Sequence, residues 1–430
     1  MSKPLPRVVV VSHMCPFPTV HGNRSRFVRL LEWFREKGIA VTFVLQPLDV
    51  ESADGLRRLR SLVDRLEVVR LRGVAARATE WANDVCIRIA RTAVPPGPRR
   101  ALGRLLRRGY PPAPQLRETW ASGDIGGQGH IDAWCWPATC RAVERAVRRD
   151  RPIAVLAEYA LLTKSFEGLP PSVLKVIDTV EVFFRNQERF HTPGLVAPRV
   201  CSPESELLAL GRADLLIAIQ RNDTRLLRDR FPQARVITVP HAYEQLARRA
   251  GGPERGSILY VGSSNPFNVH GLREFVAQAW PSILARVPDA TLRVVGSVPE
   301  ESHAGADRVL HIGRVADAEL AREYQNAHVV VNPQVAGTGL KIKCVEALSA
   351  GCPLVLNRAG ADGLEEGEGM AFFVSDNWRQ FADHVVTLLK DDRTRLALEV
   401  QARAFADRMF SPKAAFSELA SALTGDGDVA

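Results

Sequence analysis

The amino-acid sequence predicts an α/β protein with two Rossmann-like β/α/β domains. Short apolar runs rich in valine and isoleucine alternate with amphipathic helical segments and glycine-bearing loops, a pattern typical of parallel sheets covered by helices. The alternation begins at Arg7, weakens near residue 244 and begins again at Ile258. The 430 residues, of which 46% are hydrophobic, imply two cores more readily than one.

The N-terminal half opens with a β/α/β pattern. The run RVVVVS predicts a buried strand over Arg7–Ser12, helical periodicity covers Phe27–Lys37, and Ile39–Leu45 predicts the next strand. Ligands of open α/β sheets bind beyond the carboxyl ends of the strands. The loop between the first strand and the helix is therefore a candidate binding loop, and it contains Gly22 and Arg24.

Glycine and charged residues replace the apolar pattern at 244–257, which we interpret as a linker between domains. After this linker a strand is expected over Ile258–Val261 and a helix near His270. We therefore predict an N-terminal domain at 1–243 and a C-terminal domain at 258–410.

The segment from Val329 to Leu364 carries the most informative pattern. It predicts a strand over Val329–Val331, a glycine loop, a helix over Leu340–Ala350 and a second strand over Pro353–Leu356. The N-terminus of such a helix offers N–H groups and a positive dipole end to an anion.

On that helix Lys343 and Glu346 are three residues apart and hence neighbours on its surface. The lysine would suit a phosphate, and the glutamate would suit a pair of ribose hydroxyls. An isolated glycine loop before a helix is more often an ordinary turn, so the inference depends on the whole segment.

The stretch GTGLKIKCVEALSAGCPLVLNRAGADGL resembles the donor-site signature of GT-B glycosyltransferases, in particular the family 4 (group 1) class. The resemblance implies two Rossmann-like domains facing each other across a cleft, with a C-terminal helix at 411–430 that crosses back to the N-terminal domain. It implies transfer of a sugar from a nucleotide diphosphate to an acceptor hydroxyl, with retention of configuration. Further stretches, such as VIDTVEVFFRNQERF, resemble bacterial transferases of exopolysaccharide and similar pathways.

In this family a glycine loop faces the donor diphosphate and a glutamate holds the ribose, which implies these roles for Gly339 and Glu346. A second glutamate usually lies eight residues earlier, near the transferred sugar, and that position is Thr338 here. The identity of the donor sugar therefore does not follow from the resemblance.

Two cations that usually bind the diphosphate are also replaced. The family commonly has an arginine after the glycine of the first C-terminal loop and a lysine before the next helix, whereas this chain has Ser263 and, one residue displaced, His270. We expect Lys341 and Lys343 to supply the charge instead. The expected donor-binding residues are Gly262, Ser263, Ser264, His270, Arg314, Val315, Thr338, Gly339, Leu340, Lys341, Lys343 and Glu346, with Arg314 and Val315 in the loop that resembles the nucleobase site.

On the acceptor side, the resemblance implies roles for Gly22, Arg24 and Glu181. The family usually has His-Asp where this chain has valine and Glu181, so the carboxylate is kept and the histidine is lost. Two residues at predicted strand ends are candidates for the base that deprotonates the acceptor, Glu158 and His13. If the reaction retains configuration, the leaving phosphate itself could take that proton.

Two alternatives remain open at this point. A GT-B isomerase such as a nucleotide-sugar 2-epimerase would share the fold, and a catalytically inactive binding module would explain the lost cations. The irregular segment 75–129, rich in proline, glycine and arginine, favours a protein that also binds an acceptor, because acceptor recognition usually lies in variable segments.

The net charge of +9 is unevenly distributed. Fourteen arginines lie between Arg57 and Arg108, and they predict either peripheral contact with an anionic membrane beside a lipid-linked acceptor or simply a solvated helical face. Nucleic-acid binding is disfavoured because this stretch lacks interleaved aromatic residues and a recognisable reading motif. The acceptor class, whether carbohydrate, lipid-linked or small molecule, is left open.

Cysteine usage and the termini predict a cytoplasmic protein without cofactors. The seven cysteines include no CxxC pair, so a zinc site is not expected, and no DxD triplet in a suitable loop suggests a divalent metal. The N-terminal apolar run is too short for a signal peptide, and no uncharged apolar run is long enough to span a bilayer. The only expected small-molecule partner besides the acceptor is a UDP-, GDP- or dTDP-sugar.

Overall fold

The structure is a computed structural model that describes residues 6–19, 22–47, 51–70, 130–185, 201–247, 252–335, 337 and 339–424. The predicted acceptor segment 75–129 and Thr338 lie outside the described residues, as does the arginine-rich stretch beyond residue 70.

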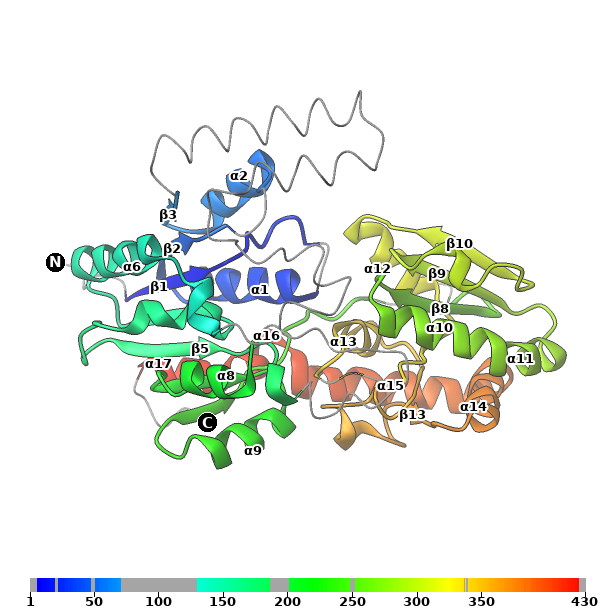
Figure 1. Cartoon of the computed structure of the whole chain (residues 1–430). Helices are drawn as coiled ribbons and strands as arrows, with labels where there is room; N and C mark the ends of the chain where they lie inside the picture. Colours follow the sequence, from blue (N-terminus) through cyan, green and yellow to red (C-terminus); the bar gives the residue numbers. More distant parts are fainter. Residues whose placement is uncertain are drawn as a thin grey trace, which may run out of the picture. The chain divides into compact units, whose positions relative to one another are not determined.

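The strands form two sheets, and several of their strands are labelled in Figure 1. The first sheet has the order β3-β2-β1-β4-β5-β6-β7, and β1 pairs in parallel with both β2 and β4. Its strands are β1 (Arg7–Ser12), β2 (Ala40–Leu45), β3 (Arg65–Val68), β4 (Ala154–Glu158), β5 (Leu174–Asp178), β6 (Leu215–Ala218) and β7 (Arg235–Thr238).

The second sheet has the order β10-β9-β8-β11-β12-β13, and all its pairings are parallel. Its order reverses direction between β8 and β11, as in doubly wound α/β sheets. Its strands are β8 (Ser257–Gly262), β9 (Thr291–Gly296), β10 (Val309–Gly313), β11 (Val329–Asn332), β12 (Leu354–Leu356) and β13 (Phe373–Val374). The prediction of an α/β protein with two parallel-sheet regions is thus confirmed.

Alternate residues of the second sheet enter two separate cores. Leu259 and Val330 belong to one cluster, whereas their neighbours Ile258 and Val329 belong to the other. Because successive side chains of a strand point to opposite faces, the two clusters lie on the two faces of the sheet. The cluster that contains Leu259 and Val330 receives side chains from α12 (Asp317–Asn326), α13 (Ile342–Ser349) and α15 (Asp392–Phe410). The cluster that contains Ile258 and Val329 receives side chains from α10 (Pro266–Gln278), α11 (Trp280–Arg286) and α14 (Trp378–Lys390).

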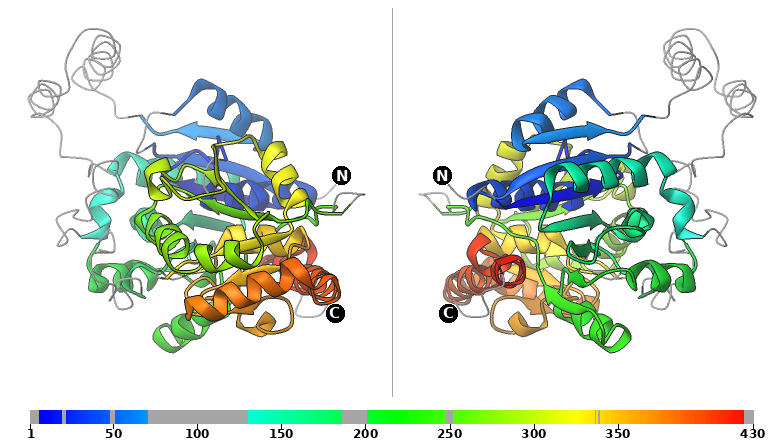
Figure 2. Two further views of the ribbon diagram at one scale, coloured as in Figure 1. Left: turned by 90° about the vertical axis from the view of Figure 1, so that its right-hand side faces the viewer. Right: turned by 90° about the vertical axis from the view of Figure 1, so that its left-hand side faces the viewer.

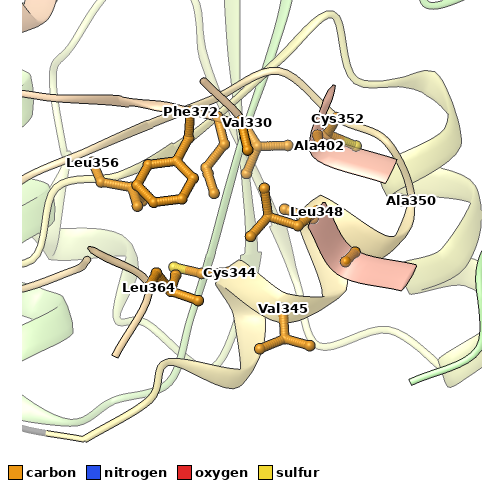
Figure 3. Packing of buried hydrophobic residues seen from close by; sticks show 14 of the residues in the cluster. Val330, Cys344, Val345, Leu348, Ala350, Cys352, Leu356, Leu364, Phe372 and Ala402 are labelled. Atoms are coloured by element: carbon orange, nitrogen blue, oxygen red, sulfur yellow. The ribbon is translucent and has the colours of Figure 1, made fainter. Parts of the chain in front are cut away.

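Figure 3 shows the cluster around α13, in which Leu348 projects from the helix toward Val330, and Val345 projects from another side of the helix. Helix α13 also packs against α15, and α14 and α15, orange to red in Figure 2, pack against each other. The helix expected to carry the donor-binding lysine and glutamate is therefore anchored by its apolar face, which fixes the direction of its polar face.

Replacing Leu348 by alanine is expected to lower the free energy of unfolding by about 2 to 5 kcal/mol, since the side chain is fully buried and its removal leaves a cavity. Denaturant unfolding measures this change. Leu396→Ala is the matched control, because that leucine on α15 is 51% exposed and its loss should change the free energy by no more than about 0.5 kcal/mol. Equal effects of the two substitutions would contradict the packing described.

By the density of its contacts the chain divides into two compact units. The first comprises residues 1–18, 34–177 and 198–213, and the second comprises 19–33, 178–197 and 214–430. The predicted boundary at 244–257 stays a prediction. The remaining helices are α1 (Gly22–Glu36), α2 (Ala53–Leu62), α6 (Pro137–Asp150), α8 (Pro203–Leu210), α9 (Arg221–Arg230), α16 (Pro412–Ala415) and α17 (Ser417–Thr424), with 3-10 turns η1 (Ile131–Trp134), η2 (Ala160–Phe166), η3 (Glu300–Ser302) and η4 (Glu365–Gly367).

The C-terminal helices contact the end of the first sheet within the second unit. Helix α17 packs against β7, and Glu418 accepts a hydrogen bond from the Thr238 amide at 3.3 Å. The Phe416 ring stacks on that of Trp33, with centroids 5.0 Å apart. The chain end is thereby fixed to α1 and β7.

Two predicted helix starts are wrong. Helix α1 begins at Gly22 rather than Phe27. The first turns of this helix bury a polar side chain, Arg26, which donates hydrogen bonds to Asp178 and, at 2.8 Å, to the Val239 carbonyl. Because these partners are distant in the sequence, residues 22–26 show no hydrophobic periodicity that would predict a helix. Helix α10 begins at Pro266 rather than near His270. There Asn265 caps the helix by accepting the Phe267 amide, and proline occupies the first turn.

The arginine-rich stretch is described only at its start. Arg57 on α2 pairs with Asp54 at 3.0 Å, and the Arg58 guanidinium lies 4.3 Å from the ring centroid of Phe17. Membrane contact through this stretch stays a prediction. Within the described residues, no helix has the length and apolar character needed to cross a bilayer.

Candidate functional site

The loops that follow β8 and β11 form the candidate site. These two strands are neighbours at the point where the order of the second sheet reverses, and such switch points are where doubly wound sheets bind ligands. The loop after β8 leads into α10, and the glycine loop after β11 leads into α13. The fold therefore places the loop after β8 and the glycine loop before α13 at the same edge of the second sheet.

Lys343 joins the two loops. Its ammonium donates a hydrogen bond to Asn268 Oδ1 at 2.8 Å, and the Asn268 amide donates to Ser263 Oγ at 3.0 Å. The ammonium also lies 5.3 Å from the ring centroid of Tyr260, and burial lowers its pKa to about 8. Among the described residues Lys343 makes no ion pair, and its hydrogen-bond partner Asn268 is neutral, while the nearby Lys341 is a second cation.

Glu346 lies one turn further along α13. Tyr324 of α12 donates a hydrogen bond to Glu346 Oε2 at 3.0 Å. Burial raises the pKa of Glu346 to about 7, an effect that the hydrogen bond from Tyr324 opposes and that the charge of Asp317 reinforces. The other carboxylate oxygen, Glu346 Oε1, has no described hydrogen-bond partner. This arrangement leaves a carboxylate oxygen that can accept hydrogen bonds from the hydroxyls of a ligand.

Gly339 is fixed on both sides by protein groups. Its φ of +84° lies in the left-handed region that favours glycine, and its amide donates to Asp362 Oδ2 at 2.8 Å. The Lys341 ammonium donates to the Gly339 carbonyl. Burial lowers the pKa of Lys341, while Asp362 and Glu181 oppose that shift. Lys341 is therefore directed to its own loop, and of the two lysines expected to replace the missing cations only Lys343 is directed to the loop after β8.

The other predicted donor residues have weaker side-chain roles. The Ser264 amide donates to Ser297 Oγ at 3.1 Å, and His270 lies inside α10 rather than at its start. Arg314 is exposed after β10, whereas the side chains of Val315 and Leu340 pack on the core around α13. Leu340 is buried and can thus offer a ligand only backbone groups, whereas Val315 is partly buried. Gly262 ends β8.

The residues expected on the acceptor side are placed as follows. Gly22 begins α1 instead of lying in a loop, and a Cβ there would come within 2.4 Å of Ile342 Cδ1, so close packing against α13 accounts for the glycine. Arg24 is in the same helical turn. Glu181 is exposed and follows Val180, whose φ of +52° is unusual for a β-branched residue. Such strain is found preferentially at functional sites.

Both candidate bases lie at strand ends in the first unit. Glu158 ends β4 with no exposed surface and accepts a hydrogen bond from Ser12 Oγ. His13 follows β1, is partly exposed, and packs edge-on against Tyr159 with ring centroids 5.4 Å apart. Since a base must reach its proton, the exposure of the two side chains favours His13.

Several contributors escaped the sequence prediction. Asn268 and Tyr324 act through side-chain hydrogen bonds to residues distant in the sequence and carry no motif. Asp362 lies in the predicted glycine-bearing loop after β12, yet no spacing rule relates it to Gly339, 23 residues away. In the described part of the chain, no three His, Cys, Asp or Glu side chains gather in a way that could hold a metal ion.

Comparison with solved structures identifies the fold as GT-B. Sucrose-phosphate synthase from Thermosynechococcus elongatus superposes with a TM-score of 0.65 at 16% identity, over 97% of this chain and 98% of that one. HepE from Anabaena, solved with UDP, gives a TM-score of 0.62 at 13% identity, over 97% and 100% of the two chains. Both predictions of the sequence, the α/β class and the GT-B architecture, agree with these similarities.

Residues 255–391 of this chain match the family model of the group 1 glycosyl transferases. A phosphatidyl-myo-inositol mannosyltransferase of Mycobacterium leprae is 32% identical over 154 residues, and an uncharacterized 44.6 kDa protein in the cps region of Klebsiella pneumoniae is 23% identical over 173 residues. These similarities cover 34% and 38% of this chain and 41% and 45% of the relatives, so less than half of either relative is matched. The matched family region contains Lys343, Glu346 and both loops of the candidate site.

Proposed function

We propose that this protein transfers a glycosyl group from a nucleotide diphosphate sugar to an acceptor hydroxyl. The observation that carries the proposal is the ammonium of Lys343, partly buried and without an ion pair among the described residues, at the switch point of the second sheet. Buried charges are normally paired, so a partly buried cation without an ion pair favours an anionic ligand. A diphosphate satisfies that need, and Glu346 on the next turn of α13 accepts the ribose hydroxyls.

The chemistry that follows is electrostatic. As the bond from the sugar to the diphosphate breaks, the sugar becomes oxocarbenium-like and negative charge grows on the departing phosphate. The Lys343 ammonium and the first-turn amides of α13, which has no side-chain cap, stabilise that charge. No step requires a metal, and we propose that the reaction proceeds without one.

The acceptor hydroxyl must lose a proton in the same reaction. We propose retention of configuration, with the departing phosphate as the proton acceptor; if the reaction inverts instead, His13 is the base that its exposure favours. Arg24 and Glu181 are proposed to bind the acceptor. We place the enzyme in the cytoplasm, with contact to an anionic membrane through the arginine-rich stretch as a proposal of its own.

A donor screen tests the proposal. UDP-, GDP- and dTDP-sugars are added to the full chain and thermal unfolding is recorded, with UDP-glucose first because HepE structures contain UDP and UDP-glucose. A ligand at a hundred times its dissociation constant stabilises a protein by about 2.7 kcal/mol, so one nucleotide sugar should raise Tm by about 2 to 4 °C. Release of nucleoside diphosphate that depends on added acceptor then shows transfer.

The outcomes separate the alternatives. No stabilisation by any of the three donor classes would contradict a nucleotide-sugar site. Stabilisation with release of the nucleoside diphosphate in the absence of acceptor would indicate hydrolysis or an epimerase-like reaction. Stabilisation without turnover across a panel of carbohydrate, lipid-linked and small-molecule acceptors would indicate a binding module.

A further inference from the structure

Asp362 accepts more hydrogen bonds than any role as a surface loop residue requires. It lies between β12 and η4 and is 7% exposed. Oδ2 accepts from the Gly339 amide at 2.8 Å and from Gln220 Nε2 at 3.3 Å. Oδ1 accepts from Arg185 Nη2 at 3.2 Å and from Asn222 Nδ2 at 3.3 Å. Both oxygens are therefore saturated by protein donors.

The carboxylate is held in its ionised form. Burial opposes ionisation, but Lys341 and Arg185 outweigh it and keep the pKa of Asp362 below its ordinary value. An ionised acceptor makes stronger hydrogen bonds than a neutral one, so its bond to the Gly339 amide is charge-assisted. Asp362 thus fixes the N–H side of Gly339, and Lys341, which donates to the Gly339 carbonyl, fixes the other side.

The protein groups that donate to Asp362 are themselves joined by further polar contacts. Arg185 pairs with Asp223, and Gln220 donates to the same aspartate at 2.8 Å. Gly363, with a φ of +86°, allows the loop to approach Gln220, because a Cβ there would lie 2.2 Å from Gln220 Oε1. The glycine loop is consequently tied, through one aspartate, to the N-terminal turn of α9.

We propose that Asp362 is a positioning residue that sets the shape of the glycine loop before the donor binds. The inference rests on the proposed function, because it assigns the loop to a nucleoside diphosphate. The Gly339 amide is already occupied by Asp362, so that amide does not bind the ligand; its role is to hold the turn from which α13 presents the amides of Ile342 and Lys343 and the Lys343 side chain. Preorganisation of this kind raises affinity by removing the ordering that binding would otherwise require.

The test compares Asp362→Asn with Glu366→Gln. Glu366 is an exposed residue of η4 that pairs with Arg221 of α9. Its replacement does not remove a hydrogen bond to Gly339. UDP is titrated calorimetrically into each full-length variant well below its Tm, or GDP or dTDP if one of these gives the larger shift in the donor screen. We expect Asp362→Asn to raise Kd about tenfold, the value of one charged hydrogen bond, and Glu366→Gln to leave it within about twofold.

A second pair of variants links the effect to Gly339. Gly339→Ala strains the loop directly, so in that background Asp362→Asn should cause little further loss of affinity; additive losses would contradict a shared role. If Asp362→Asn proves too unstable to titrate, Gly363→Ala displaces the same loop from Gln220 with the carboxylate intact and should raise Kd similarly.

The two levels of inference fail differently. A folded Asp362→Asn variant with wild-type affinity overturns the role of Asp362 and leaves the proposed function standing. A wild-type protein that binds none of the three nucleoside diphosphates overturns the proposed function itself. An effect on Tm alone, with Kd unchanged, would mean that Asp362 only stabilises the fold.

Discussion

Replacing Lys343 by methionine is expected to lower kcat/KM for the donor by about a hundredfold or more. Among the residues that the structure describes at the switch point, the Lys343 ammonium is the positively charged group that reaches the loop after β8, through Asn268 at 2.8 Å. Removing a single group that stabilises developing negative charge typically reduces turnover by 10²- to 10³-fold. Methionine keeps the aliphatic stem beside Tyr260, so the loss isolates the charge.

The pH dependence of the same variant gives a second measurement. Burial lowers the pKa of Lys343 to about 8, so its cationic form is present below that pH and is lost as the pH rises through it. In the wild type, kcat/KM should therefore fall on the alkaline side with a midpoint near pH 8, because kcat/KM follows the ionisation of the free enzyme. The limb should disappear in Lys343→Met.

Lys390→Met is the matched control, since this lysine at the end of α14 is exposed and distant in sequence from both loops of the site. It should leave kcat/KM and the alkaline limb unchanged. Wild-type activity in Lys343→Met would contradict the assignment of the diphosphate to this lysine, and a similar loss in Lys390→Met would point to an effect of net charge.

The sequence predicted the elements of the site better than the connections between them. Strand, loop and helix at 329–350 follow from local periodicity and glycine placement, and they are found within two residues of their predicted ends. The division of labour between the two lysines could not be predicted in this way. Lys341 bonds to its own loop and Lys343 to α10, a difference decided by tertiary contacts with Asp362 and Asn268.

The start of α1 was predicted wrongly for a related reason. Residues 22–26 are polar and carry no hydrophobic period, yet Arg26 is 4% exposed because Asp178 and the Val239 carbonyl satisfy it. A buried ion pair is invisible to periodicity, because each partner looks like a surface residue when taken alone. The same holds for the buried ion pair of Arg185 and Asp362, which lie 177 positions apart in the sequence.

Replacing Glu346 by glutamine is expected to weaken donor binding by about tenfold to a hundredfold and to reduce the donor-induced rise in Tm by about half or more. Two ribose hydroxyls that donate to a carboxylate form charge-assisted hydrogen bonds of about 1.5 to 3 kcal/mol each, and glutamine keeps the shape while losing the charge. The measurement is calorimetric titration of UDP or the donor found in the screen. Glu319→Gln, on the exposed first turn of α12, is the control and should bind like the wild type.

The pKa of about 7 gives this prediction its sharpest form. Because folding raises the pKa of Glu346 from 4.5, the carboxylate is protonated below about pH 7, and the form that accepts ribose hydroxyls is present only above it. Donor affinity should therefore rise with pH through about 7, and with the Lys343 limb near 8 the wild-type kcat/KM should show a narrow maximum between the two.

Tyr324→Phe distinguishes a direct role of Glu346 from general damage to the site. The Tyr324 hydroxyl stabilises the carboxylate, so its removal should raise the pKa of Glu346 further and move the acid limb to higher pH without eliminating it. Glu346→Gln should eliminate that limb. If the acid limb stayed in place in both variants, its titrating group would have to lie elsewhere, and the assignment of the ribose to Glu346 would lose its support.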